Sequence, residues 1–288
     1  MDKKRILLAI ALLAAACLTG EARRKPQMHV IESDNLRASD TILVFSPAKA
    51  KRNVPTLFLL HGWSGCYRDW SAHMDLQKLS DDTGFRIICP DGFYDSWYLD
   101  KTDSTGMKWR KFFWEELWPL MDGEYGLDSE FTFIDGLSMG GHGAMNIYLD
   151  HPERFRGAGS MSGVLDLRNA GGSRILIPAM IGADDIDSPI CRAQSAVNRL
   201  ERALPEGVSA LKPGEDRKVL VVSCGCYDTT FLPASEAFAD RCNELGLRVV
   251  ELYTPARHRW GYWTWVVRYH MEIFRQTALE NSELGWEK

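Results

Sequence analysis

The chain has 288 residues, 45% of them hydrophobic, and its 34 basic and 39 acidic side chains give a formal net charge of −5. This length and apolar fraction are enough to bury one substantial core. The acidic balance and the lack of a basic block give no support to nucleic-acid binding. Residues 27–285 contain no composition break, linker or internal repeat, so we interpret them as a single domain.

Residues 1–22 form a segment of a different kind. Three basic residues close to Met1 precede a short apolar run and a group of alanines that ends at Cys17. This order predicts a signal peptide, because the apolar run is too short for a stable membrane span. Cys17 after small residues is also typical of a lipoprotein signal, so a lipid anchor at Cys17 and ordinary cleavage near residues 16–22 both remain open. We therefore expect an exported protein that is periplasmic, secreted or lipid-anchored in a bacterial envelope.

Apolar and β-branched segments predict eight strands, near residues 28–32, 40–46, 56–60, 86–90, 131–136, 157–162, 218–224 and 247–253. Helical patterns lie near residues 71–82, 109–122, 140–150, 192–203, 233–245 and 262–279. The first two strands alternate polar and apolar residues, whereas the later ones are continuously apolar, as burial on both faces requires. The patterns predict an α/β fold: a mostly parallel eight-stranded sheet with an N-terminal antiparallel hairpin and helices on both faces.

A Gly-x-Ser-x-Gly motif joins the fifth strand to the helix that follows it. The apolar run ends at Gly136-Leu-Ser138-Met-Gly140 and passes directly into a helical pattern. Strand, tight turn and helix in this order are typical of a nucleophile elbow, where the serine occupies a strained corner with its hydroxyl exposed. Glycine suits positions 136 and 140 because the two backbones nearly touch there. The motif alone is short, so the assignment of Ser138 depends on an acid and a base in the right order.

Two further strands end close to those residues. The strand at 218–224 runs into Asp228, and the strand at 247–253 leads to His258. Because the carboxyl ends of parallel strands share one edge, we expect both side chains to lie near Ser138. His258 would then be the base that activates the serine, and Asp228 would hold the histidine tautomer. An acidic loop, residues 184–187, is the rival source of the acid.

The same edge supplies candidate donors for an oxyanion hole. One backbone N–H should come from Met139, the residue after the serine. The second should come from the loop after the strand at 56–60, which ends in His61-Gly62-Trp63. We assign it to Trp63, with Gly62 as the alternative.

Several motifs together resemble the esterase family of α/β-hydrolases that includes esterase D (S-formylglutathione hydrolase), feruloyl esterases, family-one carbohydrate esterases and mycolyltransferases. The matching motifs are Leu60-His-Gly62, Pro90-Asp-Gly92, Gly136-Leu-Ser-Met-Gly-Gly141, Cys224-Gly-Cys-Tyr-Asp228 and His258-Arg-Trp-Gly-Tyr-Trp263. The resemblance covers roughly residues 28–278. It implies the α/β-hydrolase fold, in which the triad follows the chain order Ser, Asp, His. Ala256-Arg257 before the base and Cys226-Tyr227 before the acid depart from the commoner family residues and leave the substrate open.

Aromatic residues suggest where a substrate would bind, and the cysteines test whether the chain holds a metal ion. Trp97 and Trp260 fall in loops near the predicted edge, where they would stack on sugar rings or hold an aromatic acyl group; lining of an apolar pocket is the alternative. Cys224-x-Cys226 has no second Cys/His pair with zinc spacing, so we expect neither metal nor cofactor. His142, one helical turn after the nucleophile, is interpreted as a packing neighbour.

The sequence thus favours an exported serine carboxylesterase that works through an acyl-enzyme on a small-molecule or oligosaccharide ester, with membrane contact only through an anchor at Cys17. Acetyl or feruloyl esters of polysaccharide fragments are the leading substrates. A broad-specificity short-chain esterase or an S-formylglutathione hydrolase-like enzyme is the alternative. A catalytically silent surface carbohydrate-binding protein is the hypothesis from another class.

Overall fold

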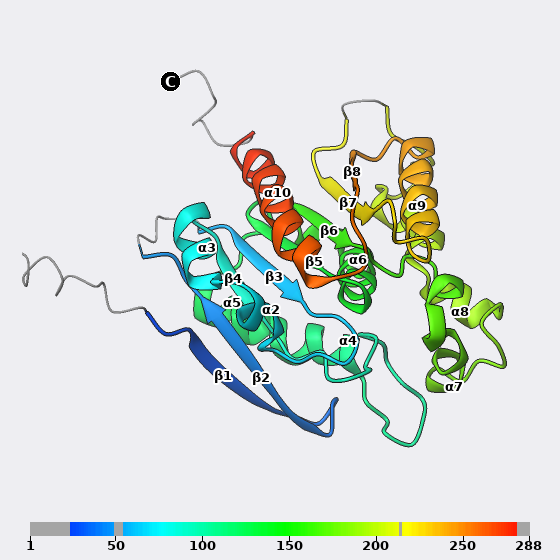
Figure 1. Ribbon diagram of the computed structural model, residues 1–288, viewed down its shortest axis with the longest axis horizontal. Helices are drawn as coiled ribbons and strands as arrows, with labels where there is room; N and C mark the ends of the chain where they lie inside the picture. The colour runs from blue at the N-terminus through cyan, green and yellow to red at the C-terminus, as the bar shows by residue number, and fades with distance from the viewer. Residues whose placement is uncertain (1–23, 49–53, 213–214, 281–288) are drawn as a thin grey trace, which may run out of the picture.

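The computed structural model describes residues 24–48, 54–212 and 215–280; the expected signal peptide and Cys17 lie outside these ranges. One eight-stranded sheet has the order β1-β2-β4-β3-β5-β6-β7-β8. The strands are β1 (Gln27–Ser33), β2 (Ala38–Phe45), β3 (Thr56–Leu60), β4 (Arg86–Cys89), β5 (Thr132–Gly136), β6 (Gly157–Met161), β7 (Val219–Gly225) and β8 (Val249–Thr254). β1 and β2 form an antiparallel hairpin, and β2 is antiparallel to β4, while β3 to β8 are mutually parallel (Figure 1). The predicted fold class is confirmed.

The parallel strands separate two hydrophobic clusters, one on each face of the sheet. Side chains alternate between the faces along a strand, so Leu57 and Phe58 of β3 belong to different clusters. Phe133 and Ile134 of β5 divide in the same way. This explains the mostly apolar composition of the central strands, because both faces of each strand are covered by helices.

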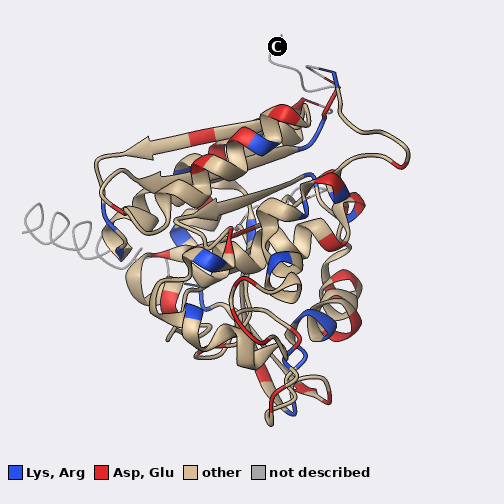
Figure 2. Cartoon of the chain, turned by 90° about the vertical axis from the view of Figure 1, so that its right-hand side faces the viewer, with Lys and Arg blue, Asp and Glu red and all other residues tan. Residues whose placement is uncertain are grey.

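Helices α2 (Asp69–His73), α3 (Leu76–Thr83) and α10 (Trp260–Leu279) cover one face of the sheet (Figure 1). Helices α4 (Trp109–Phe112), α5 (Trp118–Tyr125), α6 (Met139–Asp150) and α9 (Leu232–Glu244) cover the other. Two short helices, α7 (Ile177–Met180) and α8 (Pro189–Gln194), lie beyond the edge toward which the parallel strands point (Figure 1). Among the described residues, no helix combines the length and apolar character that crossing a membrane requires. Acidic and basic residues are interspersed along the helices (Figure 2).

Three predicted helices are broken. The helix expected at 71–82 divides at Met74, which is extended, and Asp75 caps α3 by accepting a hydrogen bond from the Lys78 amide. In the segment predicted as 109–122, a π-helical turn separates α4 from α5 just before Pro119, which has no amide to donate.

The prediction of one helix at 192–203 is wrong. α8 ends at Gln194 and is followed by two short 3-10 turns, residues 196–198 and 200–203. The physical reason is Ser195, whose extended backbone ends the helix. Its hydroxyl donates to the Cys191 carbonyl (3.1 Å) and accepts from the Leu167 amide (3.0 Å), so the chain is tied to another segment at this point.

Candidate active site

Ser138 lies at a sharp corner between β5 and α6. Its backbone angles are φ 52° and ψ −117°, a conformation that costs a non-glycine residue on the order of 1–3 kcal/mol. The neighbouring chain holds the corner, since the Ser138 amide donates to the Met161 carbonyl (2.9 Å) and the Ser138 carbonyl accepts from the His142 amide (3.1 Å). A Cβ on Gly136 would lie 2.4 Å from the carbonyl carbon of Gly140. The elbow therefore requires glycine at that position.

A hydrogen-bonded chain links the three predicted catalytic side chains. Ser138 Oγ lies 3.0 Å from His258 Nε2, and His258 Nδ1 lies 2.7 Å from Asp228 Oδ2. An ionised carboxylate only accepts, so His258 Nδ1 carries the proton and Nε2 is left to accept from the serine hydroxyl. The Asp228 side chain is 4% exposed, whereas that of His258 is 30% exposed and reachable from solvent. The tertiary structure brings together residues that are up to 120 positions apart in the chain.

The loops that carry the acid and the base are paired with each other. After β7, the Cys226 amide donates to the Thr254 carbonyl (2.8 Å) and the Tyr227 amide to the Ala256 carbonyl (3.0 Å). A Cβ on Gly225 would lie 2.3 Å from the Ala256 carbonyl oxygen, so this close approach depends on glycine. Because the two loops form one unit, the separation of Asp228 from His258 is set by backbone contacts as well as by their own hydrogen bond.

Aromatic rings on two sides fix the orientation of the His258 imidazole. The Phe231 ring lies 4.5 Å away at an angle of 32°, and the Trp263 ring meets it edge-on at 4.8 Å. Sequence reasoning missed Phe231, whose only signal is its place three residues after Asp228. The acidic loop at 184–187 is not part of this arrangement, since His258 Nδ1 is bonded to Asp228 and the aspartates of that loop are exposed.

His61 orients the loop that faces the serine. The Gly92 amide donates to His61 Nε2 (2.7 Å), so the ring carries its proton on Nδ1, which donates to the Gly62 carbonyl (2.8 Å). The Gly65 amide donates to the same carbonyl (3.2 Å). The Gly62 C=O and the Trp63 N–H belong to the same peptide and point in opposite directions, so the Trp63 N–H points away from His61 Nδ1. A Cβ on Gly62 would lie 3.5 Å from Ser138 Cβ, so this peptide borders the nucleophile.

Met139 carries the other N–H predicted for this site. It is the first residue of α6, and the first N–H groups of a helix have no acceptor within it. His142 lies further along α6 and is fully buried, with Nδ1 3.1 Å from the Val164 carbonyl. Burial lowers the pKa of His142 to about 3, so the ring is neutral. It packs inside the molecule, apart from the hydrogen-bonded chain.

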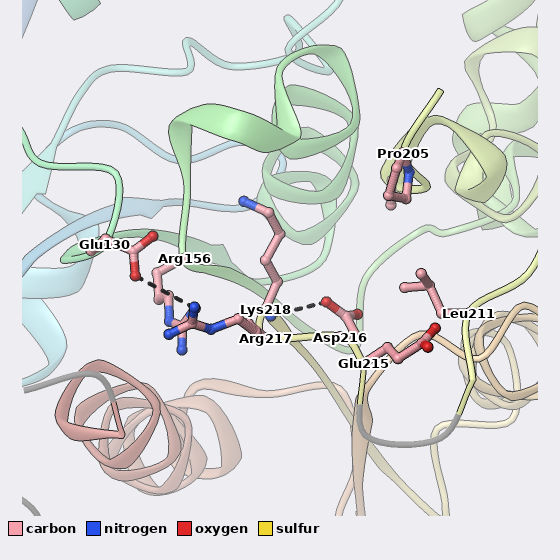
Figure 3. A pocket seen from close by; sticks show the side chains of 9 residues that line it. Glu130, Arg156, Pro205, Leu211, Glu215, Asp216, Arg217 and Lys218 are labelled. Atoms are coloured by element: carbon pink, nitrogen blue, oxygen red, sulfur yellow. Dashed lines mark hydrogen bonds and ion pairs between the residues drawn. The ribbon is translucent and has the colours of Figure 1, made fainter. Parts of the chain in front are cut away.

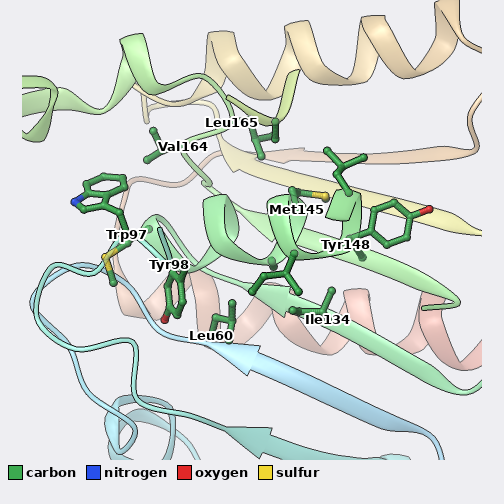
Figure 4. Close-up of a cluster of buried hydrophobic side chains, with 14 of the residues drawn as sticks. Leu60, Trp97, Tyr98, Ile134, Met145, Tyr148, Val164 and Leu165 are labelled. Carbon is green, nitrogen blue, oxygen red and sulfur yellow. The ribbon is translucent and has the colours of Figure 1, made fainter. Parts of the chain in front are cut away.

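Trp97 is not open to a ligand, which corrects the expectation that its ring lies at the edge of the site. It is only 3% exposed, has φ 55°, and belongs to the buried cluster drawn in Figure 4. Its ring meets the His142 ring nearly edge-on at 6.1 Å. The prediction failed because the loop that carries Trp97 folds back over α6, which no local pattern indicates.

Other aromatic rings are better placed for a ligand. Trp260 is half-buried, and the His73 ring stacks on it at 3.9 Å, which covers one face. Trp63 and Tyr94 are 47% and 59% exposed and pack edge-to-face at 5.1 Å. Trp63 follows Gly62, whose peptide borders Ser138, so this exposed pair belongs to a loop of the candidate site.

A separate pocket of about 300 Å³ (Figure 3) lies at the amino ends of parallel strands, whereas Ser138, Asp228 and His258 follow the carboxyl ends. Glu130, Arg156 and Lys218 line it, and each stands just before the first residue of a parallel strand. Arg156 pairs with Glu130 (3.6 Å), and Lys218 Nζ donates to two backbone carbonyls. These contacts join the segments that lead into β5, β6 and β7. Within the described ranges, no three His, Cys, Asp or Glu side chains gather in a way that would hold a metal ion.

Comparison with known proteins identifies the fold and the family. The fold is that of the α/β-hydrolases. A ferulic acid esterase superposes with a TM-score of 0.71 and 22% sequence identity, over 88% of this chain and 98% of the other. An S-formylglutathione hydrolase from Agrobacterium tumefaciens superposes with a TM-score of 0.73 and 21% identity, over 88% of this chain and 95% of the other. The model of the family described as "Putative esterase" matches residues 33–265, and the chain belongs to that family of carboxylic ester hydrolases. An acetyl esterase from Caldicellulosiruptor saccharolyticus is 27% identical over 253 residues, which cover 80% of this chain and 91% of the relative.

Proposed function

We propose that this chain is an exported serine carboxylesterase that cleaves acetyl or feruloyl esters of polysaccharide fragments through an acyl-enzyme. The main support for the proposed catalysis is the hydrogen-bonded chain from Ser138, on its strained elbow, through His258 to Asp228. Membership of an esterase family supports the reaction class. The names of the relatives, acetyl esterase and ferulic acid esterase, support the acyl groups.

The geometry suits acyl transfer in two steps. Ser138 Oγ attacks the ester carbonyl while His258 Nε2 accepts the hydroxyl proton and then returns it to the leaving alcohol. Asp228 stabilises the imidazolium that forms between these events. Water, activated by the same nitrogen, attacks the acyl-enzyme and releases the carboxylic acid. The hydroxyl and the ring are already within hydrogen-bond distance, so little reorganisation is needed.

The Met139 and Trp63 amides form the proposed oxyanion hole. Each donor of this kind contributes on the order of 3 kcal/mol to transition-state stabilisation. His61 serves here as a positioning residue, because its Nδ1–H holds the Gly62 carbonyl and so sets the direction of the Trp63 N–H. Met139 is suited to the role because the N-terminus of α6 also favours negative charge.

Export and the glycan part of the substrate rest on sequence and surface features. The basic, apolar and small-residue order of residues 1–22 supports a signal peptide, with Cys17 as the site of a lipid anchor if lipidation occurs. The exposed Trp63–Tyr94 pair supports a sugar or aromatic acyl group at the site. The proposed location is the bacterial envelope or its exterior.

The experiment uses the purified protein and its Ser138→Ala variant with p-nitrophenyl acetate, acetylated xylo-oligosaccharide and feruloylated arabinoxylo-oligosaccharide. The wild type should release acetate or ferulate, and the variant should be inactive while keeping its circular dichroism spectrum. A fluorophosphonate probe should label Ser138 stoichiometrically. Absence of hydrolysis by the wild type would favour a silent carbohydrate-binding protein. Activity on p-nitrophenyl acetate alone would retain the esterase reaction and overturn the glycan substrate.

A further inference from the structure

A second pocket lies beside the start of α10, and none of the proposed catalytic residues lines it. It has a volume of about 510 Å³ and is lined by Thr254, Pro255, Ala256, Arg259, Gly261, Tyr262 and Trp265, which we call the α10 groove. This volume is within the range of small-ligand sites. His258 does not line the groove, since its ring is turned toward Ser138 and Asp228.

Aromatic side chains border the groove and are open to solvent. Trp265 is 44% exposed, and Tyr269, one helical turn further on, is 48% exposed. Their ring centroids are 4.6 Å apart, and the ring of the buried Tyr262 lies 6.3 Å from that of Trp265. Exposed large aromatics gathered next to a hollow mark an interaction site more often than an unused surface. Flat indole and phenol faces are suited to the apolar faces of sugar rings.

The charge at the groove is positive. Arg259 lines it, and Arg268 is exposed on the same helix between the two aromatic residues. Over the ranges that the structure describes, neither guanidinium makes an ion pair or a hydrogen bond. By contrast, Arg275, also on α10, pairs with Glu272 (2.7 Å). The groove also lies at the N-terminal end of the 20-residue α10, where the helix dipole favours an anion. A carboxylate is therefore the complementary ligand group.

Gly261 keeps the groove open. A Cβ built there would meet nothing within 4 Å, so packing does not require the glycine. Glycine within a helix is destabilising by roughly 0.5–1 kcal/mol relative to alanine. The residue therefore leaves room for a ligand where a larger side chain would occupy the groove.

We propose that the α10 groove binds an acidic glycan, with a sugar ring stacked on Trp265 and a uronic-acid carboxylate paired with Arg259. The inference rests on the proposed function in one respect: the bound glycan is the chain that bears the ester. The groove then holds a charged part of the polysaccharide while another part enters the catalytic site. Its occupancy requires no catalytic residue.

The test is calorimetric titration of the purified protein with tetragalacturonate, with neutral xylotetraose as the comparison. Tetragalacturonate should bind to the wild type and to Ser138→Ala equally, which separates the groove from catalysis. Trp265→Ala and Arg259→Ala should each weaken binding about tenfold or more, as loss of an anchor residue does. Gly261→Leu, which fills the groove, should weaken it similarly. Val30→Ala removes an exposed apolar side chain on β1, at the opposite end of the sheet order from β8, and should leave this affinity unchanged.

Hydrolysis of p-nitrophenyl acetate by Trp265→Ala and Gly261→Leu should remain at the wild-type rate, which shows that both variants fold. Equal affinity of the wild type and Trp265→Ala would overturn the proposal, and so would equal affinity for xylotetraose and tetragalacturonate. A preference for an acidic peptide or for vesicles of anionic lipid over tetragalacturonate would also overturn it. If the wild type shows no esterase activity, the proposed function is wrong, whereas the binding measured at the α10 groove is unaffected.

Discussion

His270 Nδ1 lies 2.8 Å from Asp135 Oδ2 in the interior of the molecule, where neither side chain has any solvent exposure. His270 Nε2 lies 2.9 Å from Ser223 Oγ, so α10 is joined to β5 and to β7 by one imidazole. The other oxygen of Asp135 accepts from the Gly136 amide (2.7 Å) at the start of the elbow. A Cβ on Gly159 would lie 2.5 Å from the Asp135 carboxyl carbon, so β6 leaves space for this group. The same three residue types that form the candidate active site thus recur as a closed structural network.

His270→Leu should lower the free energy of unfolding by about 3–5 kcal/mol, because it leaves the buried Asp135 carboxyl without its partner. Urea denaturation followed by fluorescence measures the change. Gln276→Ala, on the exposed side of the same helix, should change stability by less than about 0.5 kcal/mol. Equal stability of His270→Leu and wild type would show that the network contributes nothing to the fold.

Asp228→Asn should keep the fold and lower kcat about 10⁴-fold, because an amide at this position favours the wrong histidine tautomer. Steady-state hydrolysis of p-nitrophenyl acetate, with circular dichroism as the check on folding, measures this effect. Asp185→Asn in the acidic loop is the matched control and should retain wild-type kcat. Near-normal activity of Asp228→Asn would remove Asp228 from the catalytic role.

Gly140→Ala should abolish the elbow geometry and with it fluorophosphonate labelling of Ser138. The added Cβ would lie 2.5 Å from the His61 carbonyl oxygen and 2.6 Å from that of Leu60, and backbone atoms cannot yield cheaply. Gly123→Ala in α5 is the control, since a Cβ there meets nothing within 4 Å. It should label normally and be more stable by about 0.5–1 kcal/mol. Normal labelling of Gly140→Ala would contradict the close approach of β3 and α6.

The pH dependence of stability should report on His142. Burial lowers its pKa from 6.5 to about 3, so the unfolded chain takes up a proton below about pH 6.5 while the folded protein does not. The free energy of unfolding should therefore fall with decreasing pH in this window, by about 1.4 kcal/mol per pH unit from this residue. Urea denaturation between pH 6.5 and 5 should show a shallower slope for His142→Gln than for wild type. Gln276→Ala, which removes an exposed side chain that does not titrate, should keep the wild-type slope. Identical slopes for His142→Gln and wild type would place a charged imidazole in the core.

Much of the molecule could be predicted from local pattern. The central strands are mostly apolar, so their two-sided burial was evident from composition, and the hairpin was marked by alternation. The helix interruptions were less evident. Ser195 ends α8 because its hydroxyl is shared with the Leu167 amide, a contact between segments that no periodicity encodes. The prediction that Trp97 is exposed was wrong for a related reason: the burial of a loop residue depends on which distant segments pack against it.

The sequence by itself determined the reaction class. The Gly-x-Ser-x-Gly motif between a strand and a helix, the later aspartate and the later histidine are all visible locally, and their chain order is that of the α/β-hydrolases. Each of the three residues follows a strand, which already predicts that they meet at the carboxyl ends of the sheet. Only the tertiary structure decided which side chains meet. It joined Ser138, His258 and Asp228 in one hydrogen-bonded chain, placed His270 against Asp135, and left Trp265 exposed beside Arg259 at the α10 groove. The physical reason is that burial and hydrogen-bond partnership depend on contacts between distant segments, whereas strand and turn patterns depend on neighbouring residues.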